Sequence, residues 1–290
     1  MTKPTKTILI TGASGALGSA AALKFARAGW LVFACDIRPP ESPQGSPQGS
    51  PPASFPEGAE DPSIRFIQTD ITSEESVQSA FEAVSSECGG LDVLLHMAGL
   101  YVMDSFLEIP PETLEKMLAV NVLGAARVNR VFLPLVQAAG GRIIVTASEL
   151  APLDPLPFNG IYSMSKRALD SVSHATALEL DLIGTRLITL YPGAYGDGMT
   201  RASVREMERM SKDSRLFPDI AERFRQIVLR ETGGARPPEE LAERILRIAK
   251  KRRPRFKYFM NNSLKLRLFS ALPTGVQAPA LRLLLGKGKK

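Results

Sequence analysis

The sequence is poor in the residues that bind metals or build disulfide frameworks. It has two histidines and two cysteines in 290 residues, and Cys35 and Cys88 stand far apart in the chain. This content favours a reducing compartment and predicts neither a disulfide-stabilised fold nor a metal centre. We therefore expect no metal cofactor and a cytoplasmic location.

Long hydrophobic runs are also missing. No stretch of about 20 apolar residues occurs, so the sequence predicts no membrane-spanning helix, and its first residues, MTKPTKTILITG, lack the apolar core of a signal peptide. The content of 44% hydrophobic and 23% charged residues is that of an ordinary soluble globular protein. The length allows one large domain or two small ones.

Acidic residues are absent from the last part of the chain. Residues 246–290 contain thirteen Lys or Arg and no Asp or Glu, while the formal net charge of the whole chain is only +6. The basic character is therefore a C-terminal feature and not a field over the whole surface. This distribution argues against a nucleic-acid-binding protein and directs attention to anionic partners of the C-terminal segment.

Apolar runs alternate with helix-like segments along the chain. Continuous apolar runs are typical of strands that are buried on both faces of a parallel sheet. The strand-like runs are residues 7–11, 30–36, 64–70, 91–99, 141–148 and 185–193, and helix-like segments lie near 16–28, 73–87, 111–138, 160–183 and 238–250. This order predicts an α/β fold with a doubly wound parallel sheet in one domain. Residues 39–63, rich in Pro, Gly and Ser, interrupt the order and predict a disordered surface loop.

A glycine-rich turn follows the first strand-like run. In TGASGALG (11–18), glycines 12, 15 and 18 permit a tight turn and a close approach of the backbone, and the next helix would present free N–H groups to a pyrophosphate. Asp36 ends the next strand-like run, where a carboxylate can accept the hydroxyls of an adenosine ribose. The alternative is that the glycines only permit the chain to turn and that Asp36 is a loop acid that binds no ligand.

A tyrosine and a lysine are four positions apart in GIYSMSK (160–166). A helix places positions i and i+4 on one face, so Tyr162 and Lys166 would point the same way. An unperturbed phenol, with a pKa of about 10, is a poor base near neutrality, and a neighbouring cation favours its charged form. The alternative is an amphipathic helix with a half-buried Tyr and a solvated Lys.

Together these motifs resemble the classical short-chain dehydrogenase/reductase family over essentially the whole chain. The resemblance implies a Rossmann-type fold, a catalytic set of Asn121 (in AVNVLG), Ser148 (in IIVTAS), Tyr162 and Lys166, and a nicotinamide cofactor. Ser148 would hold the substrate oxygen, Tyr162 would exchange a proton with it, and Asn121 would retain a water that links Lys166 to solvent. The residues implied in cofactor binding are Gly12, Ser14, Gly15, Ala16, Leu17, Gly18, Asp36, Asp70, Ile71, Ala98, Gly99, Tyr162, Lys166, Pro192, Gly193 and Tyr195.

Three departures from the family pattern stand out. Ala16 occupies a position that is usually glycine, and His96-Met97 replaces an Asn-Asn pair, which puts the rigidity of that strand end in doubt. Ser148 lies fourteen residues before Tyr162, one more than is common. A serine hydrolase is disfavoured, because it would need a histidine base and neither His96 nor His174 lies in a triad-like context.

The substrate side is expected in two segments. Residues 194–236, with two amphipathic helical patterns, resemble the family's variable substrate lid. Met199, Met207 and Met210 suit an irregular apolar pocket, and the alternative is that they only pack the helices. Residues 194–236 complete a catalytic domain of residues 1–260, and residues 261–290 form a basic amphipathic extension. This extension resembles the hydroxysteroid and retinol dehydrogenase branch, which implies a lipophilic substrate.

The partners of the extension stay open at this stage. Residues 262–290 could lie on an anionic membrane surface, pack on the domain, or form an interface in a homo-oligomer. We expect hydride transfer between a secondary alcohol or ketone and NAD, with NADP less favoured because Asp36 would oppose a 2′-phosphate and Arg38 is the only nearby cation. The alternative function is a nucleotide-binding scaffold or redox sensor without turnover.

Overall fold

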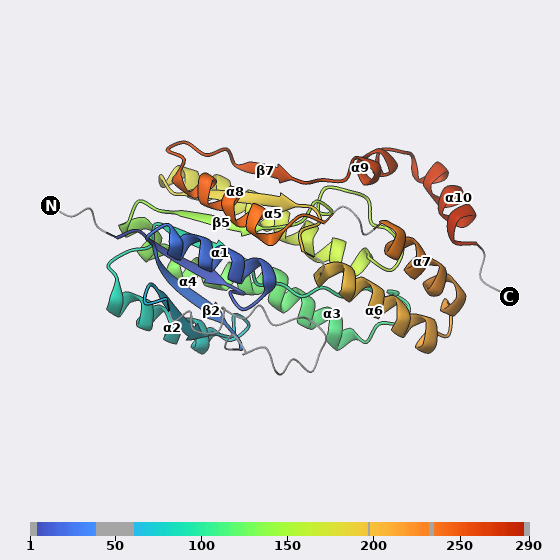
Figure 1. The fold of residues 1–290 in the computed structure, drawn as a ribbon, viewed down its shortest axis with the longest axis horizontal. Coiled ribbons are helices and arrows are strands. Elements are labelled where there is room, and N and C mark those ends of the chain that lie inside the picture. Colours follow the sequence, from blue (N-terminus) through green and yellow to red (C-terminus); the bar gives the residue numbers. More distant parts are fainter. Residues whose placement is uncertain (1–4, 39–60, 197, 232–234, 287–290) are drawn as a thin grey trace.

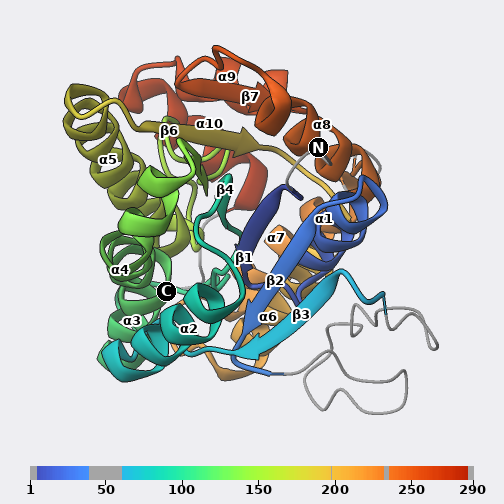
Figure 2. The ribbon, with the colours of Figure 1, turned by 90° about the vertical axis from the view of Figure 1, so that its left-hand side faces the viewer.

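The structure, a computed structural model, describes residues 5–38, 61–196, 198–231 and 235–286. The predicted disordered loop at 39–63 lies almost entirely outside these residues. The elements follow one another mostly as strand, helix, strand, and helices cover both faces of a central sheet (Figures 1 and 2).

Seven parallel strands form the sheet in the order β3-β2-β1-β4-β5-β6-β7. They are β1 (Thr7–Thr11), β2 (Leu31–Asp36), β3 (Ile64–Gln68), β4 (Val93–His96), β5 (Arg142–Thr146), β6 (Arg186–Pro192) and β7 (Lys257–Met260). The strand order changes direction between β1 and β4, and such a switch point leaves a crevice at the carboxyl ends of the strands. The predicted glycine turn, which follows β1, lies at this crevice.

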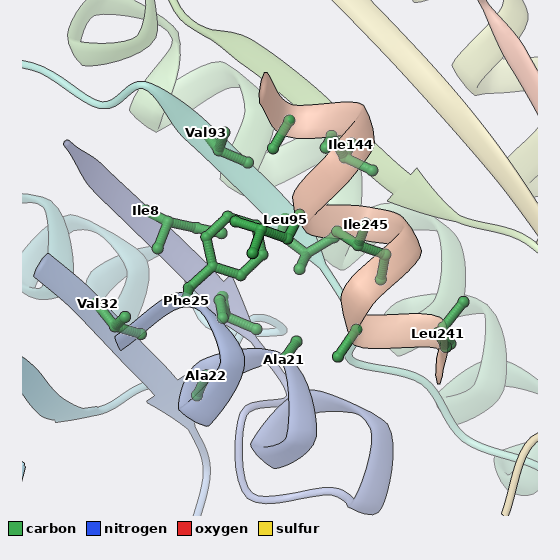
Figure 3. Close-up of a cluster of buried hydrophobic side chains, with 14 of the residues drawn as sticks. Ile8, Ala21, Ala22, Phe25, Val32, Val93, Leu95, Ile144, Leu241 and Ile245 are labelled. Carbon is green, nitrogen blue, oxygen red and sulfur yellow. The ribbon is translucent and has the colours of Figure 1, made fainter. Parts of the chain in front are cut away.

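Two helical layers bury the sheet. Helices α1 (Ala16–Arg27) and α8 (Pro238–Lys250) cover one face, and α2 (Glu74–Glu87), α4 (Ala125–Ala138) and α5 (Gly160–Leu182) cover the other. Figure 3 shows side chains of α1 and α8 meeting over the strands of the first face. Ala21 and Ala22 have no exposed surface, and their small size lets α8 approach closely enough for Ile245 to reach the core.

The helix predicted over 111–138 is present, and it contains a π-helical turn that the sequence did not predict. It consists of α3 (Pro111–Leu118), the π-helical turn η1 (Ala119–Gly124), and α4, which follow one another without a gap. Such π turns are frequent at functional sites. By length and composition this stretch could cross a membrane, but Val128 and Phe132 are buried in the domain, so it is a core helix.

Four further helices gather beyond the carboxyl ends of the strands. They are α6 (Gly198–Asp213) and α7 (Pro218–Glu231) in the predicted lid, and α9 (Leu264–Ser270) and α10 (Thr274–Leu285) in the predicted extension (Figure 1). A separate hydrophobic cluster, here called the lid cluster, joins α6, α7 and α10 to the loops after β4 and β5. It contains Met103, Phe158, Met207, Met210, Ala221, Phe224 and Leu285.

The packing between α1 and the sheet predicts a sensitive position. Phe25 is fully buried and meets Trp30 edge to face, with ring centroids 5.0 Å apart. Phe25→Ala should lower the free energy of unfolding by about 3–5 kcal/mol, because it leaves a cavity in a close-packed core. Urea denaturation followed by circular dichroism measures this. Leu182→Ala, at a side chain that is 87% exposed on α5, is the control and should change stability little.

Candidate active site

The turn between β1 and α1 is packed too tightly for side chains. Gly12 has a φ of +70°, and a Cβ there would lie 2.5 Å from the Ala98 backbone; a Cβ on Gly18 would lie 2.1 Å from the Gly12 carbonyl oxygen. Helix α1 begins at Ala16 and no side chain caps its first turn, so its N–H groups are available to an anion. Ala16 is already helical, which explains why alanine is tolerated where glycine is common.

The predicted ribose acid faces this turn. Asp36 ends β2, and its carboxylate accepts hydrogen bonds from the N–H groups of Ser14 at 3.0 Å and Arg38 at 3.3 Å. The Ser14 hydroxyl donates to the Arg38 carbonyl at 2.9 Å. The carboxylate is thereby held beside the glycine turn, where a ribose would have to lie.

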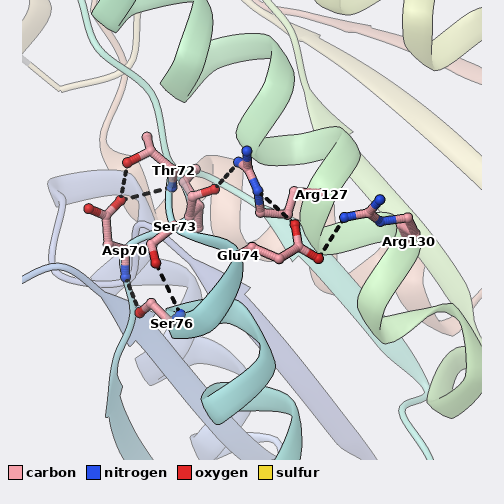
Figure 4. Close-up of polar contacts among 8 residues, drawn as sticks. Asp70, Thr72, Ser73, Glu74, Ser76, Arg127 and Arg130 are labelled. Carbon is pink, nitrogen blue, oxygen red and sulfur yellow. Dashed lines mark hydrogen bonds and ion pairs between the residues drawn. The ribbon is translucent and has the colours of Figure 1, made fainter.

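Asp70 and Ile71 form the turn that leads from β3 to α2 (Figure 4). The Asp70 carboxylate accepts from the N–H and the hydroxyl of Thr72, at 2.8 and 2.7 Å. Arg127 of α4 donates to the Ile71 carbonyl at 2.6 Å, and the Ile71 side chain packs where a Cβ on Gly124 would stand. The turn is therefore rigid and fixed to the helix layer that carries Asn121.

The end of β4 is held despite its departure from the family pattern. The Thr146 hydroxyl at the end of β5 donates to the Met97 sulfur at 3.0 Å, and the Met97 N–H donates to the Thr11 carbonyl of β1, also at 3.0 Å. His96 is buried and bonds to the Asn129 amide oxygen at 2.7 Å. Burial lowers the pKa of His96 to about 4, so the ring is neutral and serves packing.

Tyr162 and Ser148 come together below the lid. Ser148 follows β5 and Tyr162 lies in the first turn of α5, close enough for the Ser148 side chain to offset part of the rise that burial causes in the pKa of the Tyr162 hydroxyl. Arg167 donates to the carbonyls of Ala151 and Leu153 at 3.1 and 2.9 Å and holds the loop between Ser148 and Tyr162 against α5. The catalytic roles of Ser148 and Tyr162 stay a prediction.

Lys166 is buried and not solvated. Its ammonium donates to the Thr146 carbonyl at 3.1 Å and lies 5.8 Å from the centroid of the Tyr162 ring. Burial lowers the pKa of Lys166 to about 8, while burial raises the pKa of Tyr162 in spite of the nearby Ser148 side chain. Burial therefore opposes the phenolate within the protein itself. That Lys166 together with the positive charge of a nicotinamide favours the phenolate stays a prediction.

Asn121 projects from the π-helical turn into the site. Its amide oxygen accepts from the Leu100 N–H at 2.7 Å, and its amide nitrogen donates to the Leu100 carbonyl at 3.0 Å and to the Ser165 hydroxyl at 2.9 Å. A Cβ on Gly99 would lie 3.4 Å from the Asn121 oxygen and 3.5 Å from the Lys166 nitrogen. Asn121 thus adjoins Lys166 as predicted, and it also holds the loop that follows β4.

The Pro192-Gly193 turn closes the site on the side of β6. The Gly193 N–H donates to the Met260 carbonyl at 2.8 Å, and the Glu149 N–H donates to the Pro192 carbonyl at 2.9 Å. Tyr195, predicted to contact the cofactor, has its side chain in the cluster beneath α1 and α8. Its hydroxyl is buried and has no hydrogen-bond partner among the described residues, and a contact of Tyr195 with the cofactor stays a prediction.

These residues fit a dinucleotide. A glycine cradle that a Cβ would fill, an uncapped helix N-terminus and a carboxylate at the end of β2 surround the switch point of the sheet, and the Thr11 hydroxyl at its edge is buried without a partner. The loop and α1 would hold the phosphates, and the ends of β4 and β6 would hold the nicotinamide beside Tyr162.

Sequence reasoning missed two residues of the site. Thr146 bonds to both Met97 and Lys166, and Tyr101 stands edge to face with Tyr162, with ring centroids 4.8 Å apart. The sequence offered only their positions as a signal: Thr146 stands two residues before Ser148, and Tyr101 stands two residues after Gly99.

The Met199 side chain lies outside the described residues, whereas Met207 and Met210 are buried in the lid cluster.

Comparison with known proteins agrees with this geometry. The short chain dehydrogenase family matches residues 6–208. A 3-ketodihydrosphingosine reductase of Bacteroides thetaiotaomicron is 26% identical over 251 residues, which are 86% of each chain.

Solved structures share the fold. A short-chain dehydrogenase from Streptomyces avermitilis superposes with a TM-score of 0.72 at 22% identity, covering 98% of this chain and 96% of its own. An alcohol dehydrogenase from the archaeon Thermococcus sibiricus, complexed with 5-hydroxy-NADP, superposes with a TM-score of 0.64 at 20% identity, covering 88% and 96%. With its parallel sheet, glycine cradle and family match, the chain belongs to the short chain dehydrogenase family of nucleotide-binding oxidoreductases.

Proposed function

We propose that the protein interconverts a secondary alcohol and a ketone with a nicotinamide cofactor, and that its substrate is lipophilic. The observation that carries the reaction type is the convergence of Ser148, Tyr162 and Lys166 at the nicotinamide end of the glycine cradle. When bound, the nicotinamide supplies the hydride donor or acceptor.

The protein residues then have distinct tasks. Ser148 donates a hydrogen bond to the substrate oxygen and orients it toward Tyr162. Tyr162 receives the hydroxyl proton in oxidation and donates it in reduction, and acid–base catalysis of this kind contributes roughly 10²–10⁴-fold to a rate. Lys166, whose pKa is lowered to about 8, can lie near its charge transition at working pH and would exchange a proton with solvent through the water that Asn121 would retain.

The lid supports a lipophilic substrate. The lid cluster brings Met207 and Met210 of α6 against Met103 and Phe158, which come from the loops that flank the catalytic residues. Methionine adapts to irregular apolar ligands. The relative from Bacteroides is named for the reduction of a long-chain ketone, 3-ketodihydrosphingosine, which points the same way.

A surface of α9 and α10 supports contact with an anionic membrane. Exposed leucines and a valine cover this surface, and cations stand among them. The apolar residues are Leu264, Leu268, Val276, Leu283 and Leu284, each at least 50% exposed, and the cations are Lys265, Arg267 and Arg282. Amphipathic segments with this composition bind anionic lipid surfaces. A second copy docked on the same surface would bring like charges together, which disfavours a homo-oligomer there.

The opposite side of α10 is attached to the domain. Leu285 is buried in the lid cluster, and Gln277 donates to the Asp154 carboxylate at 3.0 Å and to the Leu272 carbonyl at 2.7 Å. The extension therefore packs on the domain and still leaves an apolar surface outside. We propose that this surface, and not a spanning helix, associates the enzyme with the membrane that holds its substrate.

We also propose NAD as the preferred cofactor. Asp36 is held at the glycine turn, so a 2′-phosphate there would meet a like charge. Arg38, the neighbouring cation, is exposed. The 5-hydroxy-NADP in the archaeal alcohol dehydrogenase does not fit this preference well, but at 20% identity that structure bears on the fold alone.

The function is tested with NAD(H), NADP(H) and a panel of secondary alcohols and ketones of increasing apolar size. We expect turnover that favours the larger members of the panel.

Tyr162→Phe should abolish turnover with little change in cofactor affinity, because only the transferable proton is removed. Lys166→Ala should reduce both turnover and cofactor affinity. Nucleotide binding without turnover on the whole panel would favour a scaffold. Activity within tenfold of the wild type in Tyr162→Phe would refute the proton-transfer role.

Cofactor choice is tested by the dissociation constants for NAD and NADP. The wild type should bind NAD about 10–100-fold more tightly, since each 1.4 kcal/mol corresponds to tenfold. Asp36→Asn, which keeps the shape and removes the charge, should narrow this ratio, and Arg38→Ala should leave NAD binding nearly unchanged. Tighter binding of NADP by the wild type would identify Arg38 as a phosphate clamp instead.

Membrane contact is tested by flotation with vesicles. The protein should float with phosphatidylserine-containing vesicles and not with phosphatidylcholine alone, and about 1 M salt should release it, because the Debye length then falls to about 3 Å. Leu283→Glu should reduce binding, and Leu182→Glu on α5 is the matched control. If no vesicle binding occurs and Leu283→Glu instead dissociates an oligomer in light scattering, this surface is a protein interface.

A further inference from the structure

Tyr101 occupies a fixed position next to the reacting groups. It follows Leu100, whose N–H and carbonyl are both bonded to the side chain of Asn121, at 2.7 and 3.0 Å. Because two hydrogen bonds to one amide set both the place and the direction of the Leu100 backbone, the next side chain leaves the loop in a defined direction. The π-helical turn that presents Asn121 therefore also positions Tyr101.

The ring of Tyr101 lies against the catalytic tyrosine. The two ring centroids are 4.8 Å apart and the ring planes make an angle of 64°, an edge-to-face contact. The Tyr162 side chain is only 4% exposed. A substrate oxygen must come within about 3 Å of the Tyr162 hydroxyl to exchange a proton, so the carbon skeleton attached to that oxygen must lie beside the Tyr101 ring or displace it.

The hydroxyl of Tyr101 is bonded to the lid. It lies 2.7 Å from the hydroxyl of Ser203 on α6, which is itself buried. A residue that only filled space at the edge of the lid cluster would not need this hydroxyl, since phenylalanine has the same ring. The bond instead fixes the ring between Tyr162 and α6.

Two more contacts join the same loop to the lid. The Arg209 guanidinium of α6 pairs with the buried Asp104 carboxylate at 2.6 Å, and Glu108 accepts from the Ser214 hydroxyl and the Arg215 N–H between α6 and α7, at 2.6 and 2.9 Å. Residues 101–108 are thus held at three points, two of them to α6 and one to the turn that follows it. Of these three, only the Tyr101–Ser203 contact adjoins a catalytic residue.

We infer that Tyr101 is a specificity-determining residue. Its ring forms one wall of the substrate space at Tyr162, and its bond to Ser203 limits how far a bulky substrate can displace the ring. This inference rests on the proposed oxidoreductase function and adds to it the side chains that select substrate size. Small ketones fit with the Tyr101–Ser203 bond intact, and large apolar ones require it to open.

The test compares kcat/KM for a long-chain or fused-ring ketone with that for a four-carbon ketone. Tyr101→Ala should shift the ratio toward the bulky ketone by about tenfold or more, the size of effect that a pocket wall exerts. Tyr101→Phe and Ser203→Ala should each shift it by a smaller amount in the same direction, and the double variant should match either single one, because both remove the same bond. Tyr258→Phe on β7, whose hydroxyl accepts from the Arg255 N–H, is the matched control and should leave the ratio unchanged.

A ratio within twofold of the wild type in Tyr101→Ala, or additive effects of Tyr101→Phe and Ser203→Ala, would overturn the inference. Should Tyr101→Ala fail to fold, the two milder variants decide. Hydrogen–deuterium exchange of the full chain with NAD present separates this inference from the proposed function. If no substrate is turned over, the proposed oxidoreductase function is refuted. Faster exchange of the α6 amides in Tyr101→Phe and Ser203→Ala, but not in Tyr258→Phe, would still support the role of the Tyr101–Ser203 bond in holding α6. Unchanged exchange in α6 overturns it.

Discussion

The side chain of Asn121 makes the interaction on which the arrangement of the site depends. An amide that bonds to the N–H and the carbonyl of one loop residue replaces the pairing that a strand would have provided, so the chain after β4 is ordered although it has left the sheet. A regular helix over 111–138 would not present residue 121 with the same geometry. The π-helical turn is therefore part of the site, and its irregularity is compensated by the hydrogen bonds that Asn121 makes.

Burial governs the electrostatics of the catalytic pair. Tyr162 and Lys166 lie on one face of α5, but both are under the lid, where desolvation raises the pKa of the phenol and lowers that of the ammonium. Desolvation of each group therefore favours its neutral form. An oxidised nicotinamide carries a positive charge, and such a charge beside Tyr162 would lower the pKa of the phenol. The effect would be larger in this low-dielectric environment than in water.

The lid and the extension are joined to the catalytic layer by polar contacts as well as by apolar packing. Asp104, Glu108 and Asp154 each accept hydrogen bonds from a different part of the C-terminal half of the chain. Asp104 is buried, and a buried carboxylate is stable only when it is paired. Its pairing with Arg209 therefore fixes α6, while the exposed Asp154 accepts from Gln277 and holds α10. Adaptable apolar side chains are thus held on elements with a defined position.

The sequence by itself determined the sheet, the glycine turn and the spacing of the catalytic residues. Six of the seven strands were readable because parallel strands are continuous apolar runs, Gly12 and Gly18 because a tight turn admits no side chain, and the shared face of Tyr162 and Lys166 because the helical repeat places i and i+4 together. These are local properties, and each is encoded within a few neighbouring residues.

Only the tertiary structure decided the contacts between distant segments. Tyr101 and Ser203 are 102 positions apart, Asp104 and Arg209 are 105 apart, and the Met97 sulfur found its donor on Thr146, 49 positions on. The π-helical turn at 119–124 belongs to the same group, because it allows Asn121 to reach a loop that follows another strand. Periodicity and spacing describe which way a side chain points along its own element, whereas its partner depends on how the elements pack.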